Sequence, residues 1–175
     1  MDERIHIQDI VDQALCVGCG ACSGICPASC VRMVAHVAGH LVAQVDGGRC
    51  TGCGLCRRVC PSAAESPLAA DGEDPFHGVC GEAWIGHATD ARIRQQSQSG
   101  GIVSSLLCCL LDERKVDGAV VSRFCKETRR GECAWVSTRE EVLGAAGSLY
   151  CQTPVAQAVL AHPGQRQAVV ALGCQ

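Results

Sequence analysis

Two runs of twelve residues near the N-terminus hold eight of the sixteen cysteines of the chain. They read CVGCGACSGICP at residues 16–27 and CTGCGLCRRVCP at residues 50–61, thirty-four positions apart. Seven of the twelve positions are identical, and these are four cysteines, two glycines and one proline. Cysteine thiolates bind soft transition metals, glycine permits tight turns, and proline ends an element. The two runs therefore predict a duplicated metal-binding unit.

The cysteine spacing indicates iron–sulfur clusters. Each run has the form C-x2-C-x2-C-x3-C-P, which is typical of bacterial ferredoxins with 4Fe–4S clusters. In two-cluster ferredoxins the fourth cysteine of one run ligates the cluster of the other run. This crossing predicts two ligand sets: Cys16, Cys19, Cys22 and Cys60 for cluster 1, and Cys50, Cys53, Cys56 and Cys26 for cluster 2.

Other uses of these cysteines fit less well. Zinc favours two separated pairs of ligands, often with histidine, and disulfides between cysteines two residues apart are strained. Redox-inert structural clusters remain an alternative. We expect the additional Cys30 to be a small buried apolar residue beside a cluster rather than a ligand. A third cluster that draws on Cys80, Cys125, Cys133 or Cys174 also stays open.

The elements that must position these ligands form a small unit. Between the two runs, apolar residues alternate loosely through Val31, Met33 and Val45, which predicts a hairpin that turns near Gly39. We therefore expect a two-cluster ferredoxin-like domain over residues 8–66. The Pro-, Gly- and acid-rich stretch that follows predicts a linker at 67–79.

Residues 80–175 have the pattern of alternating helices and strands. SGGIVSSLLCCLLDERKV predicts a helix whose core face includes Ile102, Leu106 and Leu107. DGAVVSRF and CAWV predict strands, and Ser137 or Thr138 is placed to cap a short helix after them. TPVAQAVLAHPG predicts a helix and RQAVVALG a last strand. The predicted fold class is α+β, with the ferredoxin-like module followed by a partial α/β domain.

Composition limits where such a protein works. The formal net charge is −3, and the aromatic residues are few, so nothing suggests a nucleic-acid partner. The charged N-terminus lacks the apolar core of a signal peptide, and the longest apolar stretch, IVSSLLCCLL, is too short for a transmembrane segment. Sixteen cysteines used for metal binding rather than for disulfides favour a reducing compartment. We expect a cytoplasmic protein.

The stretch QSQSGGIV joins a Ser-Gly-Gly turn directly to a helix. Free N–H groups at the start of a helix can receive a phosphate. An ordinary helix cap by Ser99 would give the same sequence pattern, so both interpretations stay open.

The second half of the chain resembles the beta-subunit family of coenzyme F-420 hydrogenases and dehydrogenases. The segments that carry the resemblance are RQQSQSGGIVSSLL, VDGAVVSRF, REEVLGAAGSLY and TPVAQAVL, in that order. The resemblance implies a reductase that passes electrons from 4Fe–4S clusters through FAD to a deazaflavin or similar acceptor. It also implies flavin contacts by Ser99, Gly100 and Gly101, and by Gly147, Ser148 and Tyr150 of a Gly-Ser-Lys-Tyr motif. A redox partner protein or subunit would then supply or remove the electrons.

The sequence also departs from that family. Leu149 stands where the family usually has a lysine, which removes a cation suited to a phosphate or a flavin carbonyl. Family members usually continue for a hundred or more residues, so we expect a C-terminally truncated chain whose catalytic residues are not identifiable. The alternative to an enzyme is a ferredoxin-like electron-transfer module with a non-catalytic C-terminal part.

Overall fold

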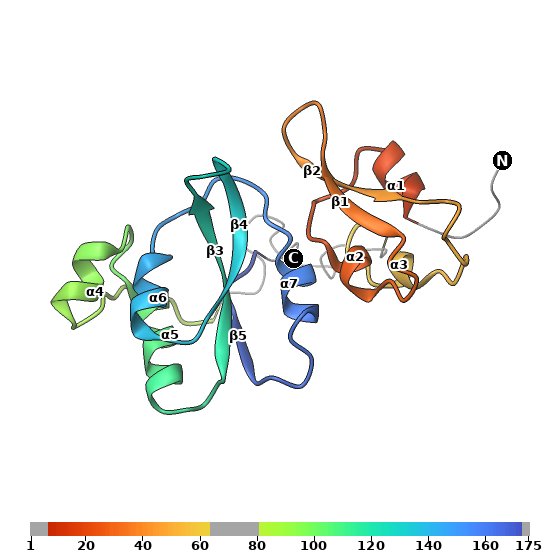
Figure 1. The fold of residues 1–175 in the computed structure, drawn as a ribbon. Helices are drawn as coiled ribbons and strands as arrows, with labels where there is room; N and C mark the ends of the chain where they lie inside the picture. Colours follow the sequence, from red (N-terminus) through yellow and green to blue (C-terminus); the bar gives the residue numbers. More distant parts are fainter. Residues whose placement is uncertain (1–6, 64–80, 173–175) are drawn as a thin grey trace.

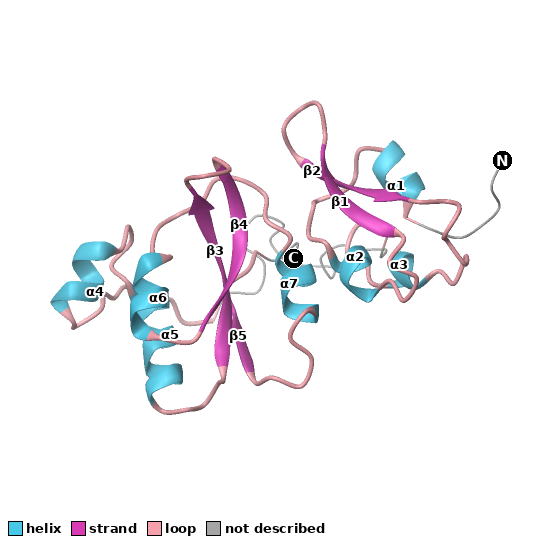
Figure 2. Ribbon diagram, in the orientation of Figure 1, coloured by secondary structure: helices cyan, strands magenta, loops and turns pink. Residues whose placement is uncertain are grey.

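The computed structural model describes residues 7–63 and 81–172 (Figures 1 and 2). The predicted linker at 67–79 lies outside the described residues, as do Cys80 and Cys174. The elements of the first part are α1 (Gln8–Asp12), α2 (Ala21–Ile25), β1 (Val31–Ala35), β2 (Leu41–Val45) and α3 (Leu55–Arg58). Those of the second part are α4 (Ala91–Gln96), α5 (Ile102–Asp112), β3 (Gly118–Cys125), β4 (Arg130–Val136), α6 (Arg139–Gly144), α7 (Val155–Leu160) and β5 (Gln167–Val169). Short helices with two small sheets confirm the predicted α+β class.

The first part is built on the predicted hairpin. Strands β1 and β2 pair antiparallel, from Val31 opposite Val45 to the turn at Gly39, where φ is +87°. Its core contains few large side chains, and cysteines contribute much of it: Ile7, Ile10, Cys22, Cys30, Val31, Ala43 and Cys56 are buried together. A core with so little apolar surface is typical of small domains that a bound metal also stabilises.

The second part is a three-stranded sheet covered on both faces. Its order is β4-β3-β5, with β3 antiparallel to β4 and parallel to β5. Helices α5 and α6 lie on one face and α7 on the other (Figure 2). Val121 and Ala119 of the central strand pack with Leu107, Val142 and Leu143 in the main core. The strands and helices predicted here from residue 102 onward are present.

The predicted core face of α5 was partly wrong. Leu107 and Cys108 are buried and Leu111 packs against them, whereas Ile102 and Leu106 are 41% and 59% exposed. The sheet contacts the side of the helix that Leu107 and Leu111 share, four residues apart, so Ile102 and Leu106 turn away from it.

Thr138, rather than Ser137, is the residue that caps α6. Its hydroxyl accepts from the Glu141 amide, and the Glu141 carboxylate accepts from the Thr138 amide, which completes a capping box. No helix within residues 7–63 and 81–172 has the length and apolar character that a membrane crossing requires.

Candidate functional site

The two cysteine runs fold into loops with the same backbone. Gly18 and Gly52 both have φ of +71°, and Gly20 and Gly54 have +77° and +73°. These left-handed conformations favour glycine. In each run a short helix begins directly after the second glycine, at the end of the loop. The repeated glycines therefore give both loops one shape, in which the cysteines can converge.

The first group of thiols draws on both runs. Cys19 and Cys22 are buried, and the neighbours that raise their pKa values electrostatically include Cys16 and Cys60. Burial, with the nearby thiolates, raises the pKa of Cys22 to about 12. Thiols buried like those of Cys19 and Cys22 ionise readily only where a cation compensates their charge, which a cluster's iron would supply. The predicted ligands of cluster 1 are thus brought together.

The second group surrounds a small cavity lined by Cys26, Cys30, Cys50, Cys53 and Cys56. It contains the four predicted ligands of cluster 2 together with Cys30. The neighbours that raise the pKa of Cys56, apart from its burial, include Cys50 and Cys53. In both groups, three cysteines of one run therefore lie near the fourth cysteine of the other. That they ligate two clusters in the crossed way remains a prediction.

Cys30 and Cys26 lie side by side but in different surroundings. Their sulfur atoms are 3.4 Å apart. Cys30 is 4% exposed, and burial raises its pKa to about 12. Although burial opposes its ionisation, hydrogen bonds from the amides of Cys30, Ala28 and Val31 lower the pKa of Cys26. Amide donors suit a sulfur that carries charge, which favours Cys26 over Cys30 as a ligand. The assignment of Cys26 as the ligand remains a prediction.

The donor set fits iron–sulfur clusters better than a single ion. Within the described part of the chain, no three His, Cys, Asp or Glu side chains approach closely enough to bind one metal ion. Thiols that surround a four-iron cube stand further apart than ligands of one ion, and the all-sulfur set with amide donors is typical of such clusters.

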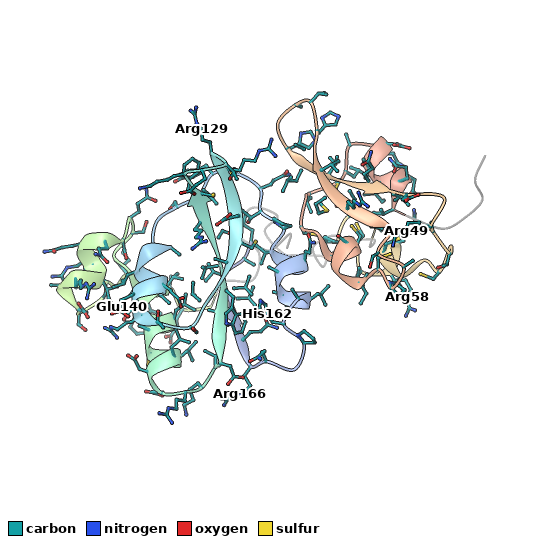
Figure 3. The ribbon with its side chains drawn as sticks, viewed as in Figure 1. Arg49, Arg58, Arg129, Glu140, His162 and Arg166 are labelled. Atoms are coloured by element: carbon teal, nitrogen blue, oxygen red, sulfur yellow. The ribbon has the colours of Figure 1, made fainter. Side chains whose placement is uncertain are left out.

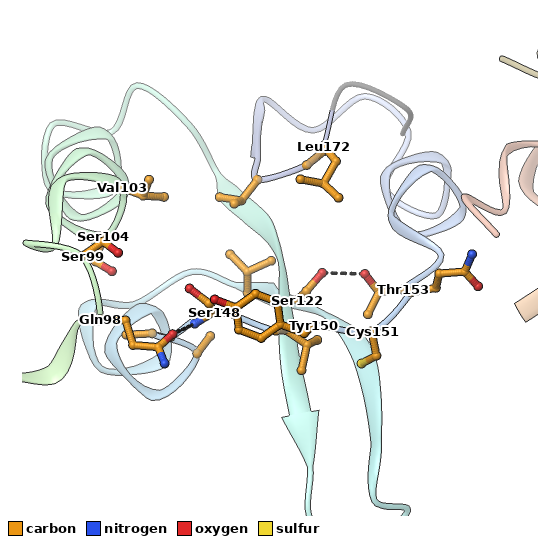
Figure 4. A pocket seen from close by; sticks show the side chains of 18 of the residues that line it. Gln98, Ser99, Val103, Ser104, Ser122, Ser148, Tyr150, Cys151, Thr153 and Leu172 are labelled. Atoms are coloured by element: carbon orange, nitrogen blue, oxygen red, sulfur yellow. Dashed lines mark hydrogen bonds between the residues drawn. The ribbon is translucent and has the colours of Figure 1, made fainter. Parts of the chain in front are cut away.

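A larger cavity, of about 1160 Å³, lies between the two parts of the chain (Figure 4). Its wall is formed by residues 14–17, 38–40, 97–99, 101–104, 145–153 and 170–172, together with Leu107, Val121, Ser122 and Val142. In the close view, Ser99 and Ser104 stand on one side of it and Ser122 and Thr153 on the other, with Tyr150 between. Pockets for ordinary small-molecule ligands have about 300–1,000 Å³, so this one has room for a dinucleotide.

The Ser-Gly-Gly turn stands at the wall of this cavity. Gly100 and Gly101 have φ of +70° and +78°, and Gly101 is the residue from which α5 begins. The Gly100 carbonyl accepts from the Ala88 amide at 2.7 Å, which fixes the turn from behind. Ser99 and Gly101 line the cavity, whereas Gly100 does not. The free N–H groups at the start of the eleven-residue helix α5 are therefore beside the cavity.

The Gly-Ser-Leu-Tyr segment forms another part of the wall. Gly147, Ser148, Leu149 and Tyr150 all line the cavity. The Ser148 amide donates to the side-chain oxygen of Gln98, which ties this segment to the residues before the Ser-Gly-Gly turn. Five of the six residues predicted to contact a flavin therefore line one cavity. That they bind flavin remains a prediction.

Several cavity residues were missed by sequence analysis. Gln98 joins two loops, and the Ser122 and Thr153 hydroxyls are hydrogen-bonded at 2.7 Å across the floor. Cys16 and His40 come from the ferredoxin-like part. Cys16 was predicted as a cluster ligand, although not as part of this cavity. The other residues had no sequence signal, because their position in the wall depends on contacts between segments far apart in the chain.

The described part of the wall carries no fixed charge. No Asp, Glu, Lys or Arg belongs to it among the residues that the structure describes, and Leu149 stands where a lysine was expected from the resemblance. A bound phosphate would therefore depend on the α5 amides and on serine hydroxyls.

Two family models match separate segments of the chain. Residues 9–65 match the family model for the 4Fe–4S dicluster domain. Residues 83–159 match the model for the N-terminal domain of the coenzyme F-420 hydrogenase/dehydrogenase beta subunit.

Individual relatives cover only parts of the chain. The coenzyme F-420 hydrogenase beta subunit of Methanothermobacter thermautotrophicus is 36% identical over 50% of this chain and 33% of its own length. An uncharacterised protein of Methanocaldococcus jannaschii is 26% identical over 82% of this chain and 44% of its own. The F-420-reducing [NiFe] hydrogenase complex from Methanosarcina barkeri matches 47% of this chain and 28% of the solved chain, with 28% identity and a TM-score of 0.38. The chain spans about a third of the first of these relatives.

Proposed function

We propose that this chain is an oxidoreductase that joins one-electron to two-electron chemistry. Its residues 83–159 belong to the coenzyme F-420 hydrogenase/dehydrogenase beta-subunit family, and its residues 9–65 form a 4Fe–4S dicluster domain. The dicluster domain carries single electrons. The cavity between the two parts binds FAD, and the acceptor is a deazaflavin such as coenzyme F-420 or a similar molecule. Such a protein would work in the cytoplasm with a redox partner protein or subunit.

One observation carries this proposal. Cys16, a predicted ligand of cluster 1, also lines the cavity that contains Ser99, Gly101 and Tyr150. A cluster held by Cys16 would therefore be next to whatever the cavity binds. Electron transfer between two cofactors requires that they lie close together. A pocket for an unrelated ligand would not need to lie beside a cluster.

The chemistry of the wall supports a flavin dinucleotide. FAD, when bound, supplies a group that accepts electrons singly and releases them as a pair. The start of α5 offers N–H groups for its phosphates, and the serine hydroxyls offer further donors. The apolar side chains of Leu107, Val121 and Val142 suit a planar ring system and keep water from it.

The second candidate is an electron-transfer module without flavin. It is favoured by the absence of charged side chains from the described wall and by Leu149. In that case the clusters would exchange electrons with partner proteins alone.

Flavin retention separates the two candidates. Protein purified without oxygen should contain about eight iron atoms, from two clusters of four, and should retain close to one FAD. Full iron content with no FAD after reconstitution would leave only the electron-transfer module.

A single substitution sharpens this test. Leu149→Lys restores a cation to the wall and should tighten FAD binding several-fold, because an ion pair with phosphate contributes roughly 0.2–1 kcal/mol at an exposed site. Phe124→Lys adds the same charge at an exposed position that does not line the cavity, and should leave FAD affinity unchanged. Equal effects of both substitutions would contradict the placement of FAD in this cavity.

A further inference from the structure

The ferredoxin-like part contacts the second part through its first cysteine run. Helix α7 packs against α2, which starts within that run (Figure 1). The Ala156 amide, in the first turn of α7, donates to the carbonyl oxygen of Cys19 at 3.0 Å. The Leu41 amide, at the start of β2, donates to the side-chain oxygen of Gln152 at 2.7 Å. The Cys19 loop is thereby bonded directly to α7, and β2 to the segment before it.

The first run is shaped for this contact. A β-carbon at Gly24 would lie 2.8 Å from the Leu160 side chain and 3.3 Å from the Gln157 α-carbon. Gly24 lies in the helix α2 and is not among the glycines with positive φ, so packing against α7 rather than the ligand loop requires it. A larger residue would push the two helices apart.

The second run differs at the equivalent positions. Thirty-four residues after Ser23 and Gly24 stand Arg57 and Arg58, in α3. Arg58 is exposed, as are Cys53 of the ligand loop and Arg49 just before it. Figure 3 shows Arg49 and Arg58 near α3, further from the second part than α2 is. The two copies thus keep the ligands identical and change the surface around them.

We propose that this asymmetry sets the order of the two clusters. The inner site, which exchanges electrons with the cavity, is that of Cys16, Cys19, Cys22 and Cys60. The outer site, that of Cys50, Cys53, Cys56 and Cys26, receives electrons from an acidic protein electron carrier that docks at Arg49 and Arg58. The order rests on the proposed function, because it requires an acceptor in the cavity. Arg58 and Arg49 are exposed, and the Arg49 guanidinium is held in place by a hydrogen bond to the Ala28 carbonyl oxygen at 3.0 Å. Two such cations suit a carrier with a negative face.

The electrons balance as follows. Each reduced carrier gives one electron to the outer site and leaves oxidised. Each electron then passes to the inner site and on to the acceptor in the cavity. Two carriers and one proton from solvent together supply the equivalent of one hydride, so a two-electron acceptor is reduced once for every two carriers oxidised.

The docking is tested without any flavin. Gly24→Gln and Arg58→Gln place the same side chain at equivalent positions of the two runs. In the holoprotein, hydrogen exchange of the Ala156 and Leu41 amides should be at least tenfold faster in Gly24→Gln than in the wild type, and unchanged in Arg58→Gln. Unchanged exchange in Gly24→Gln would overturn the docking through the first run, and with it the cluster order.

The order itself is tested by rapid mixing. With FAD bound, Gly24→Gln should slow flavin reduction at least tenfold after the clusters are reduced chemically, whereas Arg58→Gln should not. If FAD is retained and both variants reduce it at the wild-type rate, the inner site is wrongly assigned. If no FAD is bound at all, the proposed function fails while the exchange result still decides the docking.

The carrier surface has its own matched control. Two double variants remove the same charge from different surfaces. The first is Arg49→Gln/Arg58→Gln, and the control is Arg114→Gln/Arg129→Gln, at exposed positions of the second part. Reduction of the clusters by an acidic bacterial-type ferredoxin at low salt should be about tenfold slower in the first pair and unaffected in the second. Equal rates in the two pairs would place the carrier elsewhere. Chemical reduction by dithionite should be the same in both pairs.

Discussion

The turn that starts α5 offers a sharp test of how the cavity wall is held. Gly101 has φ of +78°, and any other L-residue in that conformation costs about 1–2 kcal/mol. An added β-carbon would also lie 3.0 Å from the Ile93 γ2 methyl and 3.0 Å from the Ser97 hydroxyl, so that a neighbour would have to move by a few tenths of an ångström. We therefore expect Gly101→Ala to destabilise the second part by about 2 kcal/mol.

Gly144 provides the control with the opposite sign. It lies at the end of α6, its φ is not in the left-handed region, and an added β-carbon would meet nothing within 4 Å. Alanine loses less conformational freedom on folding than glycine, so Gly144→Ala should stabilise by roughly 0.5–1 kcal/mol.

Urea unfolding followed by tryptophan fluorescence measures both changes, because Trp84 is already 85% exposed and the change in emission comes from Trp135. Trp135 lies in the sheet and stacks on His162 with ring centroids 4.2 Å apart, so its emission reports unfolding of the second part. With a slope of about 1–3 kcal/mol per molar urea, the Gly101→Ala midpoint should fall by about 1 M. The Gly144→Ala midpoint should rise by a smaller amount. If the two alanine variants have the same midpoint, the backbone argument is refuted.

Three further predictions concern the caps and the clusters. Thr138→Ala removes one half of the capping box and should destabilise by about 1 kcal/mol in the same urea assay, with Ser137→Ala closer to the wild type. Cys30→Ala should keep all the iron, whereas Cys56→Ala should lose cluster 2 and Cys60→Ala cluster 1, as read by iron content and electron paramagnetic resonance. Loss of the same cluster in the Cys56 and Cys60 variants would refute the crossed ligand sets. Removal of iron by a chelator should unfold the ferredoxin-like part before the sheet of the second part, as followed by residue-specific hydrogen exchange, because the first part has little apolar core.

The sequence predicted those features that short stretches determine by themselves. The thiol spacing, the hairpin turning at Gly39 and the strand-helix order from residue 102 onward all follow from local pattern and turn chemistry. The core face of α5 could not be obtained in this way, since leucines occur on several sides of that helix and only the sheet decides which are buried.

The contacts between the two parts could not be predicted from the sequence either. Gln152 contacts Leu41 across 111 positions, and the Gln98 side chain contacts Ser148 across fifty. A lone glutamine has no pattern that indicates its partner. Gly24 is different in this respect: comparison with Arg58 in the second run marks it as a departure between copies, and such departures are a usable sequence signal for a docking surface.

The neutral wall of the cavity leads to a last prediction about how FAD is held. Since no charged side chain of residues 7–63 and 81–172 lines the cavity, phosphate binding depends on the α5 amides and on hydroxyls. Added salt weakens attraction between ions far more than short hydrogen bonds in a partly enclosed site. Raising the salt from 50 to 500 mM should therefore weaken FAD binding by less than about threefold in the wild type.

The Leu149→Lys variant should respond more steeply to the same change in salt, because its added affinity comes from an ion pair that salt screens. Fluorescence titration of FAD at the two salt concentrations measures both proteins. A tenfold loss of affinity in the wild type would show that a cation outside the described wall contacts the phosphates. The helix start would then not be sufficient to hold the cofactor.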